Sequence, residues 1–351
     1  MSAKTKTGPL SPRPSLLRRP DRAAAAIELL QDLGLLLVIA LGAIALGFLS
    51  PVFFSRLNIE NLLFSSTIVA VVAIGETFVI LVAGIDLSVG AVLALSSVLA
   101  VGLVNDYGLP PAAAAAVSLG VGALAGLVNG FNVTRFQIPA LIATLAMMTA
   151  TRGLAFIYSG GQNIAPVPNV YIGVQAARIG GAPAIILFTL ALGAVAHVVL
   201  TRTRFGRSLY ATGGNPVAAR LSGIRTNRIV ILAYMISGAL AALGGLMITA
   251  RLEAGAATAG QGMELTVISA VVIGGVSLFG GEGKIAGVLL GVLLLGLVQN
   301  AINLLNVPPN YDYLVSGLVI AIAAGLDVYR RKYVEVGLRK RSNAAGTEPR
   351  K

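Results

Sequence analysis

The chain has 351 residues, of which 56% are hydrophobic and only 11% are charged, and its mean hydropathy is +0.86. Soluble domains carry about 25% charged residues, so this composition is typical of a polytopic membrane protein. The formal net charge of +12 lies in the two tails and in loops between apolar segments, without a nucleic-acid motif, so no nucleic-acid partner is expected. Because the chain contains no cysteine, disulfides, thiolate metal sites and thiol catalysis are excluded.

Apolar segments long enough to cross a bilayer, which takes about 20 helical residues, recur along the chain. They predict a transmembrane domain over 33–330, between a disordered cytoplasmic tail (1–32) and a basic cytoplasmic tail (331–351). The predicted fold class is therefore an all-α polytopic membrane protein with about ten transmembrane helices. These helices are expected near 33–50, 62–82, 88–104, 111–129, 138–158, 183–201, 229–250, 264–279, 284–300 and 313–329.

The distribution of Lys and Arg predicts the orientation of these spans, because cytoplasmic loops are enriched in both residues. If the N-terminus is cytoplasmic, 22 of the 26 Lys and Arg residues fall in cytoplasmic segments. Ten spans then return the C-terminus to the cytoplasm. Both termini are therefore expected on the cytoplasmic side.

A basic loop, residues 202–228, contains six arginines and no acidic residue. Within it, the segment 215–223 predicts a short helix with a signal at each end. Asn215 can cap the first backbone N–H groups, and Pro216 suits the first helical position, where no donor is needed. Gly223 can adopt the left-handed conformation that ends a helix.

Val217 and Leu221 fall on one face of this predicted helix, which is marginally stable in water without a partner because it is so short. One interpretation is a docking helix that the cytoplasmic face presents to a soluble protein. The alternative is a surface helix held by acidic membrane lipid.

Several polar residues lie within or at the ends of the predicted spans, where a charged group costs about 2.5–3.5 kcal/mol at mid-bilayer. Their carboxyl, amide and hydroxyl groups could exchange hydrogen bonds with a hydroxyl-rich solute. They could equally be helix caps and interhelical bonds. The candidates for a translocation path are Glu76, Asp86, Ser88, Asn129, Asn132, Gln137 and Thr144.

The sequence lacks the motifs of a self-sufficient transporter or an enzyme. The stretch from Gly280 to Lys284 contains a Gly-Lys pair but has Ile285 where a phosphate-binding loop needs Ser or Thr. No nucleophile elbow, HExxH metal site or chain of carboxylates through successive spans is present. We therefore expect no catalytic residue, no metal and no cofactor in this chain, with energy supplied through the basic loop.

Four segments carry a resemblance to a known family: VVAIGETFVILVAGIDLSVGAVLALSS (71–97), NGFNVTRFQIPALIATLAMMTATRGLAFIYSGGQNI (129–164), GGNPVAARLSGI (213–224) and VISAVVIGGVSLFGGEGKIAGVLLG (267–291). In chain order and over roughly 33–330, the chain resembles the ribose-type sugar permeases of bacterial ABC importers, in the branched-chain amino acid/ribose permease superfamily. The resemblance implies a multi-pass protein of the bacterial inner membrane. It further implies a permease dimer with a second copy or a paralogue, a periplasmic sugar-binding protein, and a cytoplasmic ATPase that binds the ATP and magnesium.

The resemblance also implies that the short helix is the element that couples the permease to the ATPase. The residues assigned to coupling are Gly214, Asn215, Pro216, Val217, Ala218, Ala219, Arg220, Leu221 and Gly223. The expected function is import of a monosaccharide, a pentose or a hexose. The alternatives are a nucleoside or branched-chain amino-acid permease, which shares this architecture, and an ion-coupled secondary carrier.

Overall fold

The computed structural model describes residues 22–308 and a few single positions between 311 and 325, with side chains described from residue 33 onward. Most of the predicted N-terminal tail, the whole predicted C-terminal tail and most of the tenth predicted span lie outside the described residues. Within the described part the chain is helical, apart from loops and one small hairpin.

The described helices are α1 (Arg22–Leu49), α2 (Arg56–Leu81), α3 (Val89–Tyr107), α4 (Pro111–Arg135), α5 (Ala140–Ser159), α6 (Asn169–Ala176), α7 (Ala184–Arg202), α8 (Arg204–Gly214), α9 (Pro216–Leu221), α10 (Thr226–Leu252), α11 (Met263–Ile273) and α12 (Ile285–Leu304). Strands β1 (Arg178–Ile179) and β2 (Ala182–Pro183) form an antiparallel hairpin between α6 and α7, with Ile179 opposite Ala182.

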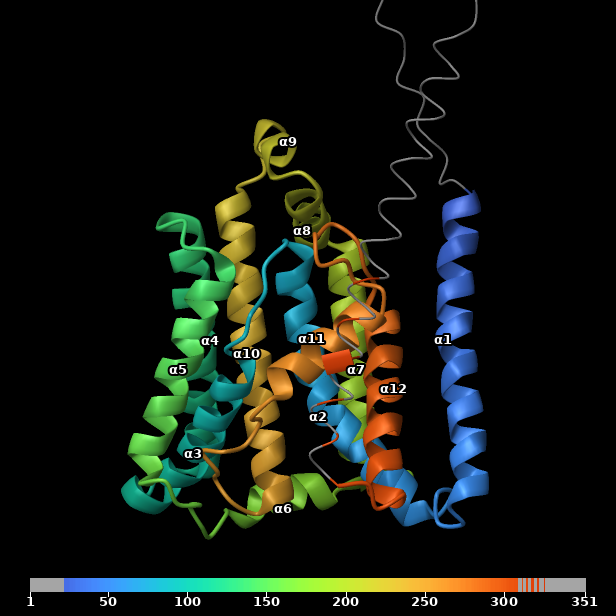
Figure 1. Cartoon of the computed structure of the whole chain (residues 1–351). Helices are drawn as coiled ribbons and strands as arrows, with labels where there is room; N and C mark the ends of the chain where they lie inside the picture. Colours follow the sequence, from blue (N-terminus) through green and yellow to red (C-terminus); the bar gives the residue numbers. More distant parts are fainter. Residues whose placement is uncertain are drawn as a thin grey trace, which may run out of the picture.

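The long helices run side by side, with α8 and α9 at one end of the molecule and α6 at the other (Figure 1). Seven of the described helices are long and apolar enough to cross a membrane: α2, α3, α4, α5, α7, α10 and α12. Each matches a predicted span, and the apolar part of α1 over Leu33–Leu49 matches the first. The prediction of a polytopic helical membrane protein is therefore confirmed, whereas the count of ten stays a prediction.

The eighth predicted span, 264–279, is not a full span, because α11 has only 11 residues. It ends at Ile273, where the chain turns at Gly275 in a left-handed conformation (φ 84°). The segment 274–284 then returns to the α8 end of the molecule, where α12 begins (Figure 1). Sequence analysis also missed α6, α8 and the hairpin, because these elements are short and less apolar than the spans.

The core is built around α10, which packs on α2, α3 and α4. Two glycines of α4 permit this packing: a Cβ atom on Gly126 would lie 2.0 Å from the carbonyl oxygen of Tyr234, and one on Gly122 would lie 2.4 Å from that of Gly238. Such backbone contact is the usual device for packing helices in lipid, where burial of apolar surface gives no drive. Gly122 and Gly126 therefore allow α4 and α10 to pack backbone against backbone.

Candidate functional site

Helix α9 projects beyond the end of the long helices (Figure 1). The Oδ1 atom of Asn215 accepts hydrogen bonds from the backbone N–H groups of Val217 (3.1 Å) and Ala218 (3.0 Å). Pro216 is the first helical residue, and Gly223 follows the helix in the left-handed region (φ 84°). The predicted short helix with its two end signals is therefore confirmed, and every signal that shapes it is local.

The apolar face of α9 points away from the protein. Val217 is 63% exposed and Leu221 is 85% exposed, whereas Ala219 on the opposite face is buried. Arg220 is also exposed. The exposed apolar face formed by Val217 and Leu221 is therefore suited to binding a partner protein.

Helix α8 connects α9 to the membrane core. Thr203 caps it, since its Oγ1 accepts a hydrogen bond from the N–H of Gly206 at 3.1 Å. Leu209 is fully buried, and the ring of Phe205 stacks on that of Phe78 in α2 with 6.2 Å between centroids. The cap and the spacing of four between Phe205 and Leu209 are signals from which this helix could have been predicted.

Three stretches of backbone meet where α8 ends. A Cβ atom on Gly213 would lie only 1.8 Å from the carbonyl oxygen of Leu81, the last residue of α2. The same oxygen accepts a hydrogen bond from the N–H of Gly281 at 2.9 Å. A Cβ atom on Gly280 would lie 2.8 Å from the N–H nitrogen of Ala83. The end of α8 therefore contacts the backbone directly before the segment 82–88.

After this junction the segment 82–88 turns back into the molecule, and it places Asp86 in a fully enclosed position (1% exposed). The Oδ1 atom of Asp86 accepts hydrogen bonds from the N–H (3.0 Å) and Oγ (2.5 Å) of Ser88 and from Nδ2 of Asn129 (3.4 Å). Its Oδ2 atom accepts one from the hydroxyl of Ser237 in α10 (3.2 Å). These donors compensate for the loss of hydration at the buried carboxyl group.

The backbone of the same segment is held from three helices. The Oε1 atom of Glu76 in α2 accepts a hydrogen bond from the N–H of Asp86 at 3.0 Å. The carbonyl oxygen of Ile85 accepts from Thr144 in α5 (3.2 Å) and from the hydroxyl of Tyr234 in α10 (3.4 Å). Glu76 Oε2 and Asn129 Oδ1 are buried and have no hydrogen-bond partner among the described residues.

Five of the seven predicted path residues thus form one buried polar network: Glu76, Asp86, Ser88, Asn129 and Thr144. All five are enclosed, so in this conformation they hold the segment 82–88 in the core and do not line an open path. Their role in translocation stays a prediction.

The other two predicted path residues lie apart from the network. Gln137 is exposed in the turn between α4 and α5, with φ 54°, and Asn132 is half-buried with its carbonyl oxygen bonded to the N–H of Ile138 (3.2 Å). Sequence analysis missed Tyr234 and Ser237, which complete the network from α10. The presence of a hydroxyl-bearing Ser237 in the middle of an apolar span was the available signal.

Long apolar helices around a buried polar network, with a projecting helix at one end, define a multi-pass helical membrane protein. The chain belongs to the family described as branched-chain amino acid transport system / permease component, whose profile matches residues 58–324. It is accordingly a transport subunit and a multi-pass protein of the bacterial inner membrane.

Curated relatives cover most of the chain. It is 39% identical over 307 residues to the ribose import permease protein RbsC of Haemophilus influenzae, covering 86% of this chain and 94% of the relative. It is 40% identical to the fructose import permease protein FrcC of Rhizobium meliloti, covering 85% of both chains. It is 37% identical to the L-arabinose ABC transporter permease protein AraH of Azospirillum brasilense, covering 92% of this chain and 95% of the relative. No solved structure matches the chain.

Proposed function

We propose that this chain is the transmembrane permease subunit of an ATP-driven importer of a monosaccharide, a pentose or a hexose. The relatives named above carry ribose, fructose or arabinose in their names, at 37–40% identity over most of their length. The family description also names branched-chain amino acids. The sugar assignment is favoured because each of the three relatives named above is a permease named for a sugar.

The observation that carries the proposal is the exposed apolar face of α9, attached through α8 to the backbone junction at Leu81. A cytoplasmic ATPase that seats Val217 and Leu221 in a groove would move α9 when it closes on ATP. Because Gly213 touches Leu81 without an intervening side chain, that movement would reach the segment 82–88 and the Asp86 network directly. The chain itself binds no nucleotide in this mechanism; ATP and magnesium belong to the ATPase.

The proposed orientation places α9 in the cytoplasm and α6 at the periplasmic side, with about ten transmembrane helices and both termini cytoplasmic. Arg135 and Lys284 lie at helix ends on the α9 side, in agreement with the preference of basic residues for the cytoplasm. The proposed partners are a second permease copy or a paralogue within the membrane, membrane lipid around it, and a periplasmic sugar-binding protein at the α6 end.

Leu221→Asp tests the coupling role. The leucine is exposed, so the variant should fold and insert normally, yet the charge should abolish seating of α9 in an apolar groove. We expect ATP-driven uptake of D-ribose, L-arabinose or D-fructose and co-purification of the ATPase to fall together, by roughly 10-fold or more for a charge buried without a partner. The measurement is uptake in vesicles reconstituted with the ATPase and the binding protein.

Phe136→Asp serves as the matched control, because Phe136 is also exposed at the α9 end but lies in the α4–α5 turn. It should leave both readouts near those of the unmodified chain. Normal uptake with the ATPase still bound to Leu221→Asp would contradict the coupling role and favour a lipid-bound surface helix.

The orientation is tested by single cysteines in this cysteine-free chain, expressed without the ATPase. Ala218→Cys on α9 should react with a membrane-impermeant maleimide only after the cells are permeabilised. Asn169→Cys at the start of α6 should react in intact cells, since both positions are exposed on the protein surface. Labelling of Ala218→Cys from outside would contradict the proposed topology.

A further inference from the structure

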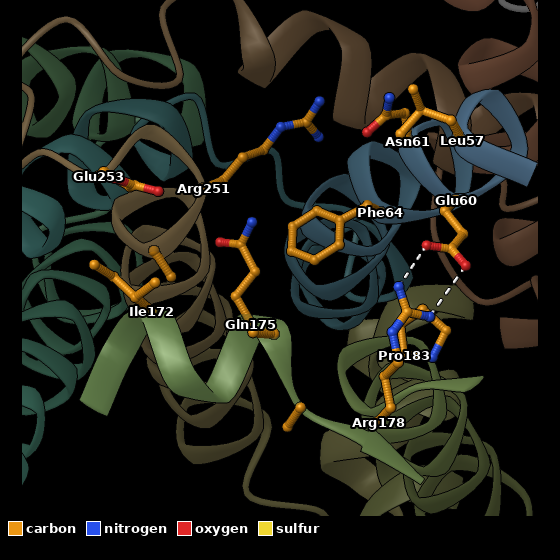
Figure 2. Close-up of a pocket in the computed structure, with 13 residues that line it drawn as sticks. Leu57, Glu60, Asn61, Phe64, Ile172, Gln175, Arg178, Pro183, Arg251 and Glu253 are labelled. Atoms are coloured by element: carbon orange, nitrogen blue, oxygen red, sulfur yellow. Dashed lines mark hydrogen bonds and ion pairs between the residues drawn. The ribbon is translucent and has the colours of Figure 1, made fainter. Parts of the chain in front are cut away.

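A cavity of about 470 Å³ opens at the end of the molecule opposite α9. It lies between the first turns of α2, helix α6 with the following hairpin, and the last turn of α10 (Figure 2). Its volume falls within the range of about 300–1,000 Å³ in which small-molecule sites lie. The buried network around Asp86 shares no residue with this cavity.

One wall of the cavity is held by an ion-pair cluster in which two arginines share one carboxylate. Arg178 of the hairpin donates through two nitrogens to the two carboxylate oxygens of Glu60 in α2, at 2.7 and 3.0 Å, and Arg56 donates to the same carboxylate at 2.8 Å. The Glu60 carboxylate raises the pKa of the Arg178 guanidinium, so the pair stays ionised. This bidentate contact fixes the hairpin against α2 and gives the wall a defined shape.

The opposite wall presents polar groups that form few or no hydrogen bonds to the described residues. The Oε1 atom of Gln175 is shielded from solvent and receives no hydrogen bond from the described residues, and its amide points toward the space between Arg251 and Phe64 (Figure 2). The guanidinium of Arg251 lies 5.6 Å from the centroid of the Phe64 ring and donates one N–H to Ser65. Its other N–H groups make no hydrogen bond to a described residue.

Glu253 completes this wall and forms no ion pair with a described residue. It caps the end of α10 in the left-handed conformation (φ 49°), which residues other than glycine adopt rarely. The cavity is therefore lined by two carboxylates and two guanidinium groups, and Arg56 adds a third guanidinium group beside Glu60.

We propose that this cavity is a binding site for a neutral, polyhydroxylated solute of the monosaccharide class, at the side from which an importer receives its cargo. Sugar hydroxyl groups both donate and accept, so they can donate to Glu253 and accept from Arg251 and from the amide nitrogen of Gln175. Charged groups of both signs line the cavity, so any ionic solute would meet a like charge there, whereas a neutral one would not. The ring of Phe64 and the aliphatic side chain of Ile172 offer apolar surface for the C–H faces of a sugar.

This inference rests on the proposed function for its direction of transport and its class of solute. It assigns the solute a site within a single permease chain, next to the periplasmic surface and before the solute reaches the membrane core.

A protection experiment tests the site directly. Ala176 lines the cavity, whereas Val174 lies on the same helix, is exposed and does not line it. Ala176→Cys and Val174→Cys are labelled with a small maleimide in the full-length permease in lipid nanodiscs, with and without millimolar D-ribose, L-arabinose or D-fructose. At least one sugar should slow labelling at Ala176→Cys several-fold and leave Val174→Cys unchanged.

The contribution of Gln175 is then measured in the Ala176→Cys background. Gln175→Met keeps a side chain of similar length but removes the amide group, so the sugar concentration that gives half-protection should rise roughly 2- to 10-fold, the effect of one neutral hydrogen bond. Gln162→Met is the matched control, because Gln162 is an exposed glutamine on the same side of the molecule. It should leave the half-protection concentration unchanged.

Three results would overturn the site. The first is an absence of protection by all three sugars while the unmodified importer still takes one of them up, which would leave the proposed function standing. The second is equal slowing at Val174→Cys, and the third is protection by L-leucine but by no sugar. Failure of the unmodified importer to transport any of these sugars would instead contradict the proposed function.

Discussion

Helix α9 and the segment 82–88 are both short, and both depend on hydrogen bonds to polar side chains, but the two are held by different means. In α9 the cap Asn215 bonds the N–H groups of Val217 and Ala218, two and three residues away. In the buried segment Asp86 is held by Asn129 and Ser237, which lie 43 and 151 residues away along the chain. A local element keeps its shape while its surroundings move, whereas an element held from three helices changes only when they do.

This contrast suits the proposed mechanism. The part that touches a partner needs a stable shape of its own, since it must transmit force without unfolding. The segment 82–88, which would move inside the membrane in response, needs hydrogen bonds that can break and re-form together. The backbone junction of Gly213 with Leu81 joins the two.

Removal of the buried carboxyl group should produce the largest effect on stability. Asp86→Ala leaves the hydroxyl groups of Ser237 and Ser88 and the N–H of Ser88 without their acceptor in the core. Unpaired buried donors cost about 1–3 kcal/mol each, so we expect a loss of about 3–5 kcal/mol in the free energy of unfolding. The measurement is thermal unfolding of the purified chain in detergent.

Asp106→Ala is the matched control for this variant. Asp106 is exposed and accepts one hydrogen bond from Tyr158, so its loss should change stability by less than about 1 kcal/mol. If both aspartate variants unfold at the same temperature, the Asp86 network does not hold the segment 82–88 in place.

An added methyl group at the junction should give the next largest effect. Gly213→Ala places a Cβ atom against the Leu81 oxygen, so the backbones must separate, at a cost of about 1–3 kcal/mol. Uptake should fall more than stability does, because the separation loosens the contact between α8 and the segment 82–88. ATP-driven uptake and thermal unfolding are measured on the same preparations.

The adjacent Gly214→Ala separates a steric effect from a general effect of losing glycine, since a Cβ atom there has no neighbour within 4 Å. It should leave both uptake and stability close to those of the unmodified chain. Equal uptake by the Gly213→Ala and Gly214→Ala variants would show that the junction does not transmit movement.

Loss of the helix cap should give the smallest effect, confined to α9. Asn215→Ala removes the acceptor of two N–H groups, which costs about 1 kcal/mol of helix stability. Amide hydrogen exchange at Val217 and Ala218 should accelerate roughly fivefold, while the unfolding temperature of the whole chain stays the same. A large drop in that temperature would show that α9 is not the independent element described here.

The sequence by itself determined the features that depend on composition and on neighbouring residues. Apolar segments of bilayer length predicted the long helices, and the Asn215, Pro216 and Gly223 signals predicted α9, because capping acts within a few residues. The polar residues that matter in the core could also be picked out, since few polar groups occur in apolar segments and each needs a partner.

The tertiary structure alone decided which of those residues meet. Asn129 bonds to Asp86 and Thr144 bonds to the adjacent Ile85, whereas Asn132 and Gln137 reach neither, and no spacing along the chain distinguishes the two pairs. The same holds for Tyr234 and Ser237, which reach the network only because glycines let α10 pack closely on α4. Helix periodicity specifies the face on which a side chain lies, but contacts between distant helices depend on packing that acts across the whole molecule.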